Sequence, residues 1–172
     1  SPEHACEYHS GKVTWVVFGD SHAVELAYAL ADELKPNHEA VRHFSLSSCS
    51  PAFERTTDDS ADCSRWTMEA IRLISEDPNV QNVLVSYRLQ AYLYGGHEGV
   101  YPLLPHKGSD AQRQQLWRSY VAVLRQLAAA GKTVVLVLQA PEIRRDVDQL
   151  ILGRRFAAEN IAGVNREWWD RR

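Results

Sequence analysis

The sequence predicts an α/β fold, a three-layer sandwich in which a mostly parallel sheet carries helices on both faces. Strand-like apolar runs alternate with amphipathic helical stretches from one end of the chain to the other. The 172 residues suit one ordinary globular domain, and an apolar fraction of 45% can build a core. Ligands of such sheets bind beyond the carboxyl ends of the strands, so motifs that directly follow strands are the first functional candidates.

The expected elements follow from residue type and spacing. Runs of β-branched and aromatic residues predict strands over residues 13–18, 41–46, 80–86 and 133–138. Apolar residues at helical spacing predict helices over residues 23–35, 64–75 and 110–130, with Pro36 ending the first and Gly131 the last. We expect a loop rich in glycine, tyrosine and proline at about 93–109, one or two helical segments over 142–172, and a frayed N-terminal extension over residues 1–12.

Charge and hydropathy exclude two classes of partner. The net charge of −3 provides no general basic field for nucleic acid or anionic lipid. The longest apolar runs are far shorter than the roughly 20 residues that a membrane span needs. The N-terminus lacks a signal-peptide pattern, so an export signal would have to lie outside this chain.

The three cysteines are too few for a disulfide scaffold. Cys49 and Cys63 bracket a polar segment, and a disulfide between them would close a loop of about 15 residues. The alternative is a pair of reduced thiols in a cytosolic protein. Cys6 is then left over, either free or paired with a cysteine outside the chain. His4, Cys6 and His9 match no known metal-site spacing, so we expect no metal.

The strongest motif is Gly19-Asp20-Ser21-His22, which stands directly between the first strand and the first helix. Backbone N–H groups and the dipole at a helix N-terminus favour negative charge. This position suits a serine nucleophile whose attack generates an oxyanion, with Gly19 allowing a tight backbone. The alternative is that Asp20 or Ser21 acts only as a helix N-cap.

Strand-Gly-Asp-Ser-His-helix resembles the first sequence block of the SGNH/GDSL hydrolase superfamily. The similarity is closest to SGNH domains fused to acyltransferase-3 membrane proteins, which O-acetylate bacterial surface polysaccharides. These domains tend to follow their second strand with Ser-x-Cys-x-Pro, and residues 47–51 read Ser-Ser-Cys-Ser-Pro. Their third strand tends to end with a small residue, arginine and tryptophan, then tyrosine; residues 86–92 read Ser-Tyr-Arg-Leu-Gln-Ala-Tyr, with Leu89 departing from the tryptophan. The resemblance covers roughly residues 13–170.

The resemblance assigns roles to individual residues. It makes Ser21 the nucleophile and its N–H one oxyanion donor, within a turn completed by Gly19 and Asp20. Ser48 falls where the family places its second donor, normally a glycine N–H. Arg88 lies near the block where many members have asparagine, so its guanidinium is a candidate for an oxyanion or a sugar hydroxyl; an ordinary ion-paired arginine is the alternative. No cofactor is implied.

The catalytic base is missing from the expected place. The superfamily takes its histidine from a late Asp-x-x-His block, and the chain contains neither Asp-x-x-His nor Glu-x-x-His. Either this chain lacks the C-terminal strand or helix of a longer domain, or another histidine substitutes, or the domain is a non-catalytic binder. His22 adjoins Ser21 too closely to present its ring to that hydroxyl. His97 and His106, in the loop after the third strand, are left as solvated residues or substrate contacts.

The implied function is that of an extracytoplasmic O-acyltransferase domain. Ser21 would accept an acetyl group, delivered by a membrane acyltransferase module, and pass it to a sugar hydroxyl of a surface polysaccharide. A periplasmic location follows, with a tether to the inner membrane through a segment outside this chain. A carbohydrate esterase or deacetylase would use the same residues with water as the acceptor.

Two further interpretations come from different classes. A glycan-binding module would keep the fold without the triad. The tyrosines at positions 87, 92, 94 and 101 could stack on sugar rings or form a packed cover over the sheet edge. A flavodoxin-like or receiver domain would bind flavin or phosphate, but the expected phosphate loop and acidic pocket are missing.

Overall fold

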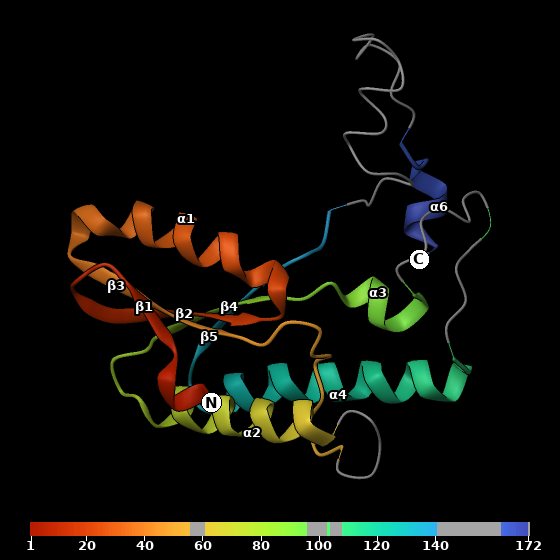
Figure 1. The fold of residues 1–172 in the computed structure, drawn as a ribbon, viewed down its shortest axis with the longest axis horizontal. Coiled ribbons are helices and arrows are strands. Elements are labelled where there is room, and N and C mark those ends of the chain that lie inside the picture. The colour runs from red at the N-terminus through yellow and green to blue at the C-terminus, as the bar shows by residue number, and fades with distance from the viewer. Residues whose placement is uncertain (56–60, 96–102, 104–107, 141–162, 172) are drawn as a thin grey trace, which may run out of the picture.

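A five-stranded sheet forms the centre of the computed structural model, which describes residues 1–55, 61–95, 103, 108–140 and 163–171 (Figure 1). The strand order is β1-β3-β2-β4-β5. The strands are β1 (Cys6–Tyr8), β2 (Lys12–Gly19), β3 (Glu39–Ser45), β4 (Asn82–Ser86) and β5 (Thr133–Val137). All neighbours pair in parallel except β1, which is antiparallel to β3. The predicted α/β class with a mostly parallel sheet is confirmed.

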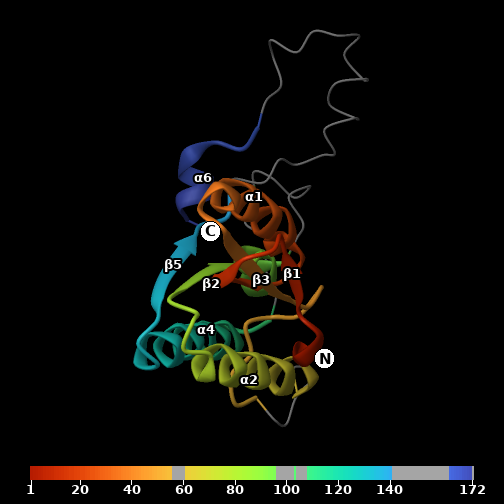
Figure 2. The same cartoon turned by 90° about the vertical axis from the view of Figure 1, so that its left-hand side faces the viewer.

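Helices cover both faces of this sheet, as the two views show (Figures 1 and 2). Helix α1 (Val24–Leu34) lies on one face, and α2 (Ala61–Glu76) and α4 (Asp110–Ala129) lie on the other. The α1 layer buries alanines against valines, which lets the helix approach the sheet closely. The core of the opposite layer is larger, and its buried members include Phe18, Phe44, Ile74, Val123 and Leu127.

Short helical elements complete the described chain. They are η1 (Pro2–His4), η2 (Ser21–Ala23), η3 (Lys35–Asn37), α3 (Leu89–Tyr94) and α6 (Arg166–Asp170). Helix α3 occupies a stretch that periodicity did not mark as a helix. Most of the segment expected to be helical near the C-terminus, residues 141–162, lies outside the described residues. None of the described helices is long and apolar enough to span a membrane.

The N-terminal segment differs from the frayed end that the sequence suggested. Residues 6–8 form the edge strand β1, with Cys6 opposite His43 and Tyr8 opposite Val41 on β3. The Tyr8 ring packs edge-on against Tyr28 of α1, at 6.1 Å between ring centroids. Three residues are too few to show a strand pattern, so only this distant pairing reveals the element.

The ends of three strands meet at one edge of the sheet. Gly19, the last residue of β2, stands opposite Ser45 of β3 and Ser86 of β4. The segments that follow these strands therefore leave the sheet side by side. They contain the residues singled out by the motifs: Ser21, Ser48 and Arg88.

Candidate active site

Ser21 occupies an exposed position at the start of a helix. It is the first residue of η2, which runs directly into α1, and Ala23 behind it is fully buried. The buried alanine fixes the turn against the sheet while the serine side chain remains accessible. The positive end of the helical segment thus lies beside an accessible hydroxyl, as a nucleophile requires.

Asp20 holds this turn in place. Its side chain is almost fully buried, with 1% exposed. One carboxylate oxygen accepts the His22 N–H at 2.9 Å, and the other accepts the Arg88 N–H at 2.9 Å. The Asp20 N–H donates to the Ser86 carbonyl at 3.3 Å. Asp20 is therefore the N-cap of η2 and also ties the segment after β2 to the segment after β4.

Gly19 permits a close approach between two backbones. A Cβ atom at this position would lie 1.7 Å from the Ser86 carbonyl oxygen and 3.2 Å from the Ala23 Cβ. No side chain fits there without moving β4 or η2. The glycine of the motif is thus explained by packing at the end of β2.

Ser48 lies in the turn after β3. Its φ angle of 60° is left-handed, a conformation that glycine adopts most easily. The Cys49 N–H closes this turn on the Leu46 carbonyl at 3.2 Å, and the Leu46 N–H donates to the Gly19 carbonyl at 3.2 Å. The turn that presents Ser48 is therefore attached to the end of β2, two residues before Ser21.

The predicted disulfide is present beside this turn. Cys49 and Cys63 are bonded, with their Cα atoms 5.3 Å apart. The bond anchors the turn to the first residues of α2, and Cys49 itself is buried. Cys6 is an exposed free thiol.

Two backbone donors are available at this edge of the sheet. Among the described residues, the N–H groups of Ser21 and Ser48 have no hydrogen-bond acceptor. Both belong to turns tied to the end of β2. Such donors can stabilise a developing oxyanion without prior reorganisation.

A family model described as the SGNH domain fused to AT3 domains matches residues 1–172. The chain belongs to this SGNH family. No curated protein matches the chain. Members of the SGNH family are generally hydrolases or acyltransferases, and the AT3-fused kind implies an O-acyltransferase partner domain.

In this SGNH domain, Arg88 contributes through its backbone. It is the N-cap residue of α3, and its N–H is the group that Asp20 binds. Its side chain is partly buried and lowers the pKa of Tyr92 by its charge. Burial of Tyr92 has the largest effect and raises its pKa, and the charge and the hydrogen bond of Asp20 raise it further. Together they outweigh the charge of Arg88, so the pKa of Tyr92 is raised. Tyr92 therefore stays protonated and donates to the same carboxylate, a contact that the sequence did not reveal.

The neighbouring tyrosines have different environments. Tyr87 is 4% exposed, and its ring makes edge contacts with Phe18 at 5.9 Å and Tyr120 at 6.1 Å. Burial raises the pKa of Tyr87, and the charge of Asp20 adds to this effect. Tyr87 is a core residue that supports the sheet edge, so it cannot stack on a sugar. Tyr94 is partly exposed, and Tyr101 lies outside the described residues.

The described part of this SGNH domain contains no base in contact with the serine. His22 is exposed, its backbone N–H is bound by Asp20, and no histidine in the described ranges hydrogen-bonds the Ser21 hydroxyl. His97 and His106 lie outside those ranges. No group of three His, Cys, Asp or Glu side chains among the described residues is arranged to hold a metal ion.

Proposed function

We propose that this SGNH domain is the part of an O-acyltransferase that passes an acetyl group to a sugar hydroxyl of a surface polysaccharide, through an acyl-enzyme on Ser21. The observation that carries the proposal is the accessible Ser21 on a turn that the buried Asp20 carboxylate fixes through two backbone N–H groups. The membership in the AT3-fused SGNH family supports the same chemistry.

The reaction divides into two acyl transfers. In the first, the Ser21 hydroxyl oxygen bonds to the acyl carbon while its proton passes to a base. The negative charge on the carbonyl oxygen is stabilised by the N–H groups of Ser21 and Ser48 and by the positive end of η2 and α1. The donor's leaving group then departs with the proton, leaving acetyl-Ser21. In the second transfer, a sugar hydroxyl attacks the ester, its proton passes to the base, and Ser21 regains a proton.

The base belongs to a part of the molecule that the structure does not describe. We propose a histidine, either His97, His106 or one in a longer form of the protein. We do not assign this role to Asp20, because its carboxylate is buried and is held by the His22 and Arg88 N–H groups that fix the turn.

We further propose that the domain works outside the cytoplasm, in the periplasm, tethered to the inner membrane through its partner module. The Cys49–Cys63 disulfide favours an oxidising compartment. The AT3-fused family supplies a membrane acyltransferase module that would deliver the acetyl group.

Intact-mass detection of fluorophosphonate labelling tests the nucleophile. We expect one label on a form of the protein that contains the base, none on its Ser21→Ala variant, and an unchanged label on Ser47→Ala, whose serine is exposed in the neighbouring turn. Labelling of the chain by itself directs the search for the base to His97 and His106, tested by alanine variants. Labelling only in a form that continues past residue 172 places the base there.

A non-catalytic glycan-binding module is the second candidate, favoured by the missing Asp-x-x-His block. Absence of labelling in both forms of the protein would support it and refute the acyl-enzyme. An esterase would show the same labelling, so a second assay separates it: acetylated product that appears only when a glycan acceptor is added identifies a transferase. Hydrolysis at a rate independent of glycan identifies an esterase or deacetylase.

A further inference from the structure

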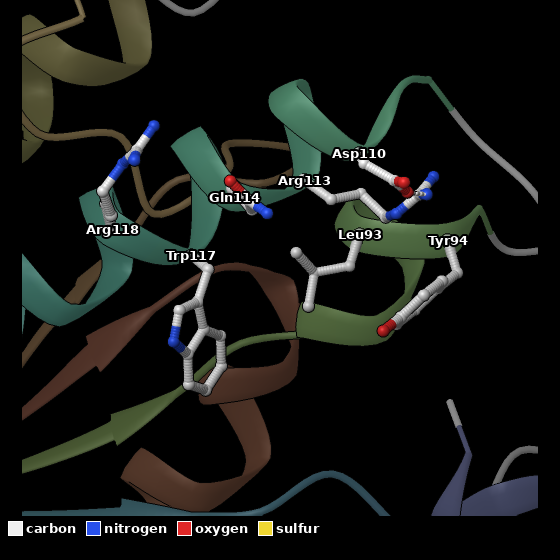
Figure 3. Close-up of a pocket in the computed structure, with 7 residues that line it drawn as sticks. All are labelled: Leu93, Tyr94, Asp110, Arg113, Gln114, Trp117 and Arg118. Carbon is white, nitrogen blue, oxygen red and sulfur yellow. Dashed lines mark hydrogen bonds and ion pairs between the residues drawn. The ribbon is translucent and has the colours of Figure 1, made fainter.

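A groove runs along the exposed side of α4. It consists of two adjoining hollows of about 630 Å³ and about 520 Å³. The first, shown in Figure 3, lies between α3 and the N-terminal half of α4. The second continues along α4. Both hollows are lined by Trp117 and Arg118, so they form one elongated surface, which we call the α4 groove.

Trp117 provides a flat apolar platform at the middle of the α4 groove. Half of the side chain is exposed, at 50%. Its ring packs against Tyr120 at 5.9 Å between centroids, and Tyr120 in turn packs against the buried Tyr87. This contact supports one side of the indole, which lowers the cost of ordering the ring when a ligand binds. An exposed, rigid indole face with polar neighbours suits the apolar C–H face of a sugar ring.

The charge of the α4 groove is opposite to that of the whole chain. Among the residues that the structure describes, its walls carry Arg113, Arg118 and Arg125 against a single acidic residue, Asp110, whereas the chain has a net charge of −3. Asp110 pairs with Arg113, whose guanidinium also lies over the Tyr94 ring at 5.8 Å. Arg118 and Arg125 are exposed and have no ion pair within the described part of the chain. They are available for charged, planar groups such as carboxylates.

The α4 groove is connected to the candidate active site through α3. This helix begins at Arg88, whose N–H binds Asp20, and its Tyr92 side chain hydrogen-bonds the same carboxylate. Tyr94, at the end of α3, already lines the groove. From Arg88 to Tyr94, the α-helical rise of about 1.5 Å per residue gives roughly 9 Å along the axis of α3. In Figure 1, α3 and the N-terminal half of α4 lie at the same end of the molecule as the start of α1.

We propose that the α4 groove binds an acidic glycan, a chain whose sugar rings carry carboxylates, and that this chain is the acceptor presented to Ser21. The identification as acceptor rests on the proposed function; the binding itself does not. One ring stacks on Trp117, the carboxylates bind Arg118 and Arg125, and the Gln114 amide hydrogen-bonds ring hydroxyls. The elongated groove takes several units of the chain, so neighbouring hydroxyls approach the turn held by Asp20.

Calorimetric titration of the chain with oligoglucuronate tests the site, with the carboxyl-reduced form of the same oligosaccharide as the matched neutral ligand. We expect the reduced form to bind at least about tenfold more weakly. Trp117→Ala should weaken oligoglucuronate binding about tenfold through loss of ring stacking. Arg118→Gln should weaken it to a similar degree and remove most of the preference for the acidic form. Tyr28→Ala, which removes an aromatic side chain 56% exposed on α1, is the control and should bind as the wild type does.

Several results would overturn the proposal. They are the absence of oligoglucuronate binding, equal binding of the carboxyl-reduced form, or Trp117→Ala and Arg118→Gln variants that fold and bind unchanged. Tighter binding of single-stranded DNA than of oligoglucuronate would assign the α4 groove to nucleic acid instead. Glycan binding without fluorophosphonate labelling of Ser21, in this chain and in the form that continues past residue 172, would refute the acyl-enzyme and keep the groove. Labelling of Ser21 without glycan binding would refute the α4 groove as a glycan site and keep the acyl-enzyme.

Discussion

Replacing Gly19 with alanine adds a methyl group at the point where β2, β4 and η2 come closest. The new Cβ would start 1.7 Å from the Ser86 carbonyl oxygen, and real Cβ contacts essentially never fall below 3.0 Å. The two backbones must therefore separate by about 1.3 Å. That movement strains the Asp20 N–H to Ser86 hydrogen bond and the bond from the Arg88 N–H to Asp20.

The expected cost combines overpacking with weakened hydrogen bonds. Overpacking a tight site costs about 1–3 kcal/mol, and each weakened bond about 1 kcal/mol. We therefore expect Gly19→Ala to lose about 3–5 kcal/mol of unfolding free energy, measured by urea denaturation. Ser21 labelling should slow in parallel because the turn is displaced.

Gly163→Ala is the control for this substitution. An added Cβ at Gly163 meets no atom within 4 Å, so its effect should stay within about 0.5 kcal/mol. A Gly19→Ala protein that is as stable as Gly163→Ala would show that the end of β4 yields freely, and the packing argument for this glycine would be wrong.

Three further perturbations test other parts of the structure. Asp20→Asn replaces one acceptor oxygen with a donor that faces a backbone N–H, so we expect a loss of about 1.5–3 kcal/mol in urea denaturation; an unchanged midpoint would contradict the bridging role. Reduction of the Cys49–Cys63 bond should lower the free energy of unfolding by about 3 kcal/mol, so equal urea midpoints with and without reductant would contradict a stabilising role of this disulfide. Cys6→Ser should leave the free energy of unfolding unchanged, since that thiol is free and exposed. Burial holds the pKa of His43 below its usual 6.5, so between the folded pKa and 6.5 the unfolded chain binds more protons. The free energy of unfolding should therefore fall as the pH drops below about 6.5. His43→Asn should flatten this part of a plot of urea midpoint against pH. Parallel plots for the wild type and His43→Asn would exclude His43 as the cause of the pH dependence.

The longer elements of the fold were predictable because their patterns are local. The apolar runs at 13–18 and 133–138 fall within β2 and around β5, and the capped pattern at 110–130 corresponds to α4. The N-terminal end of α4 even carries a complete capping box formed by Ser109 and Gln112. Such signals are contained in neighbouring residues, so a single sequence shows them.

The elements that were missed depend on distant partners. Helix α3 has only six residues and no side-chain cap of its own. The N–H of its N-cap residue, Arg88, is bound by Asp20, 68 residues earlier in the chain. Strand β1 likewise exists only through its pairing with β3. No local pattern encodes either contact.

The candidate site was predictable in part. The motif located Ser21 and the resemblance pointed to Ser48 and Arg88, and the structure brings their three segments to one edge of the sheet. The acceptor role of Asp20 and its bond to Tyr92 require the fold to be known. The same holds for the α4 groove, because its lining comes from two helices that a loop separates.

The bridge that Asp20 forms also bears on when, during folding, Ser21 would acquire the reactivity proposed for it. The carboxylate joins two segments 68 residues apart, and both are in position only when β4 has paired with β2. A chain that has folded only its N-terminal half already contains Ser21 but lacks the Arg88 N–H that completes the turn. On the proposed function, we expect reactivity at Ser21 to appear only after β2 and β4 have paired, so the rate at which a refolding sample becomes susceptible to fluorophosphonate would time the closure of the central sheet.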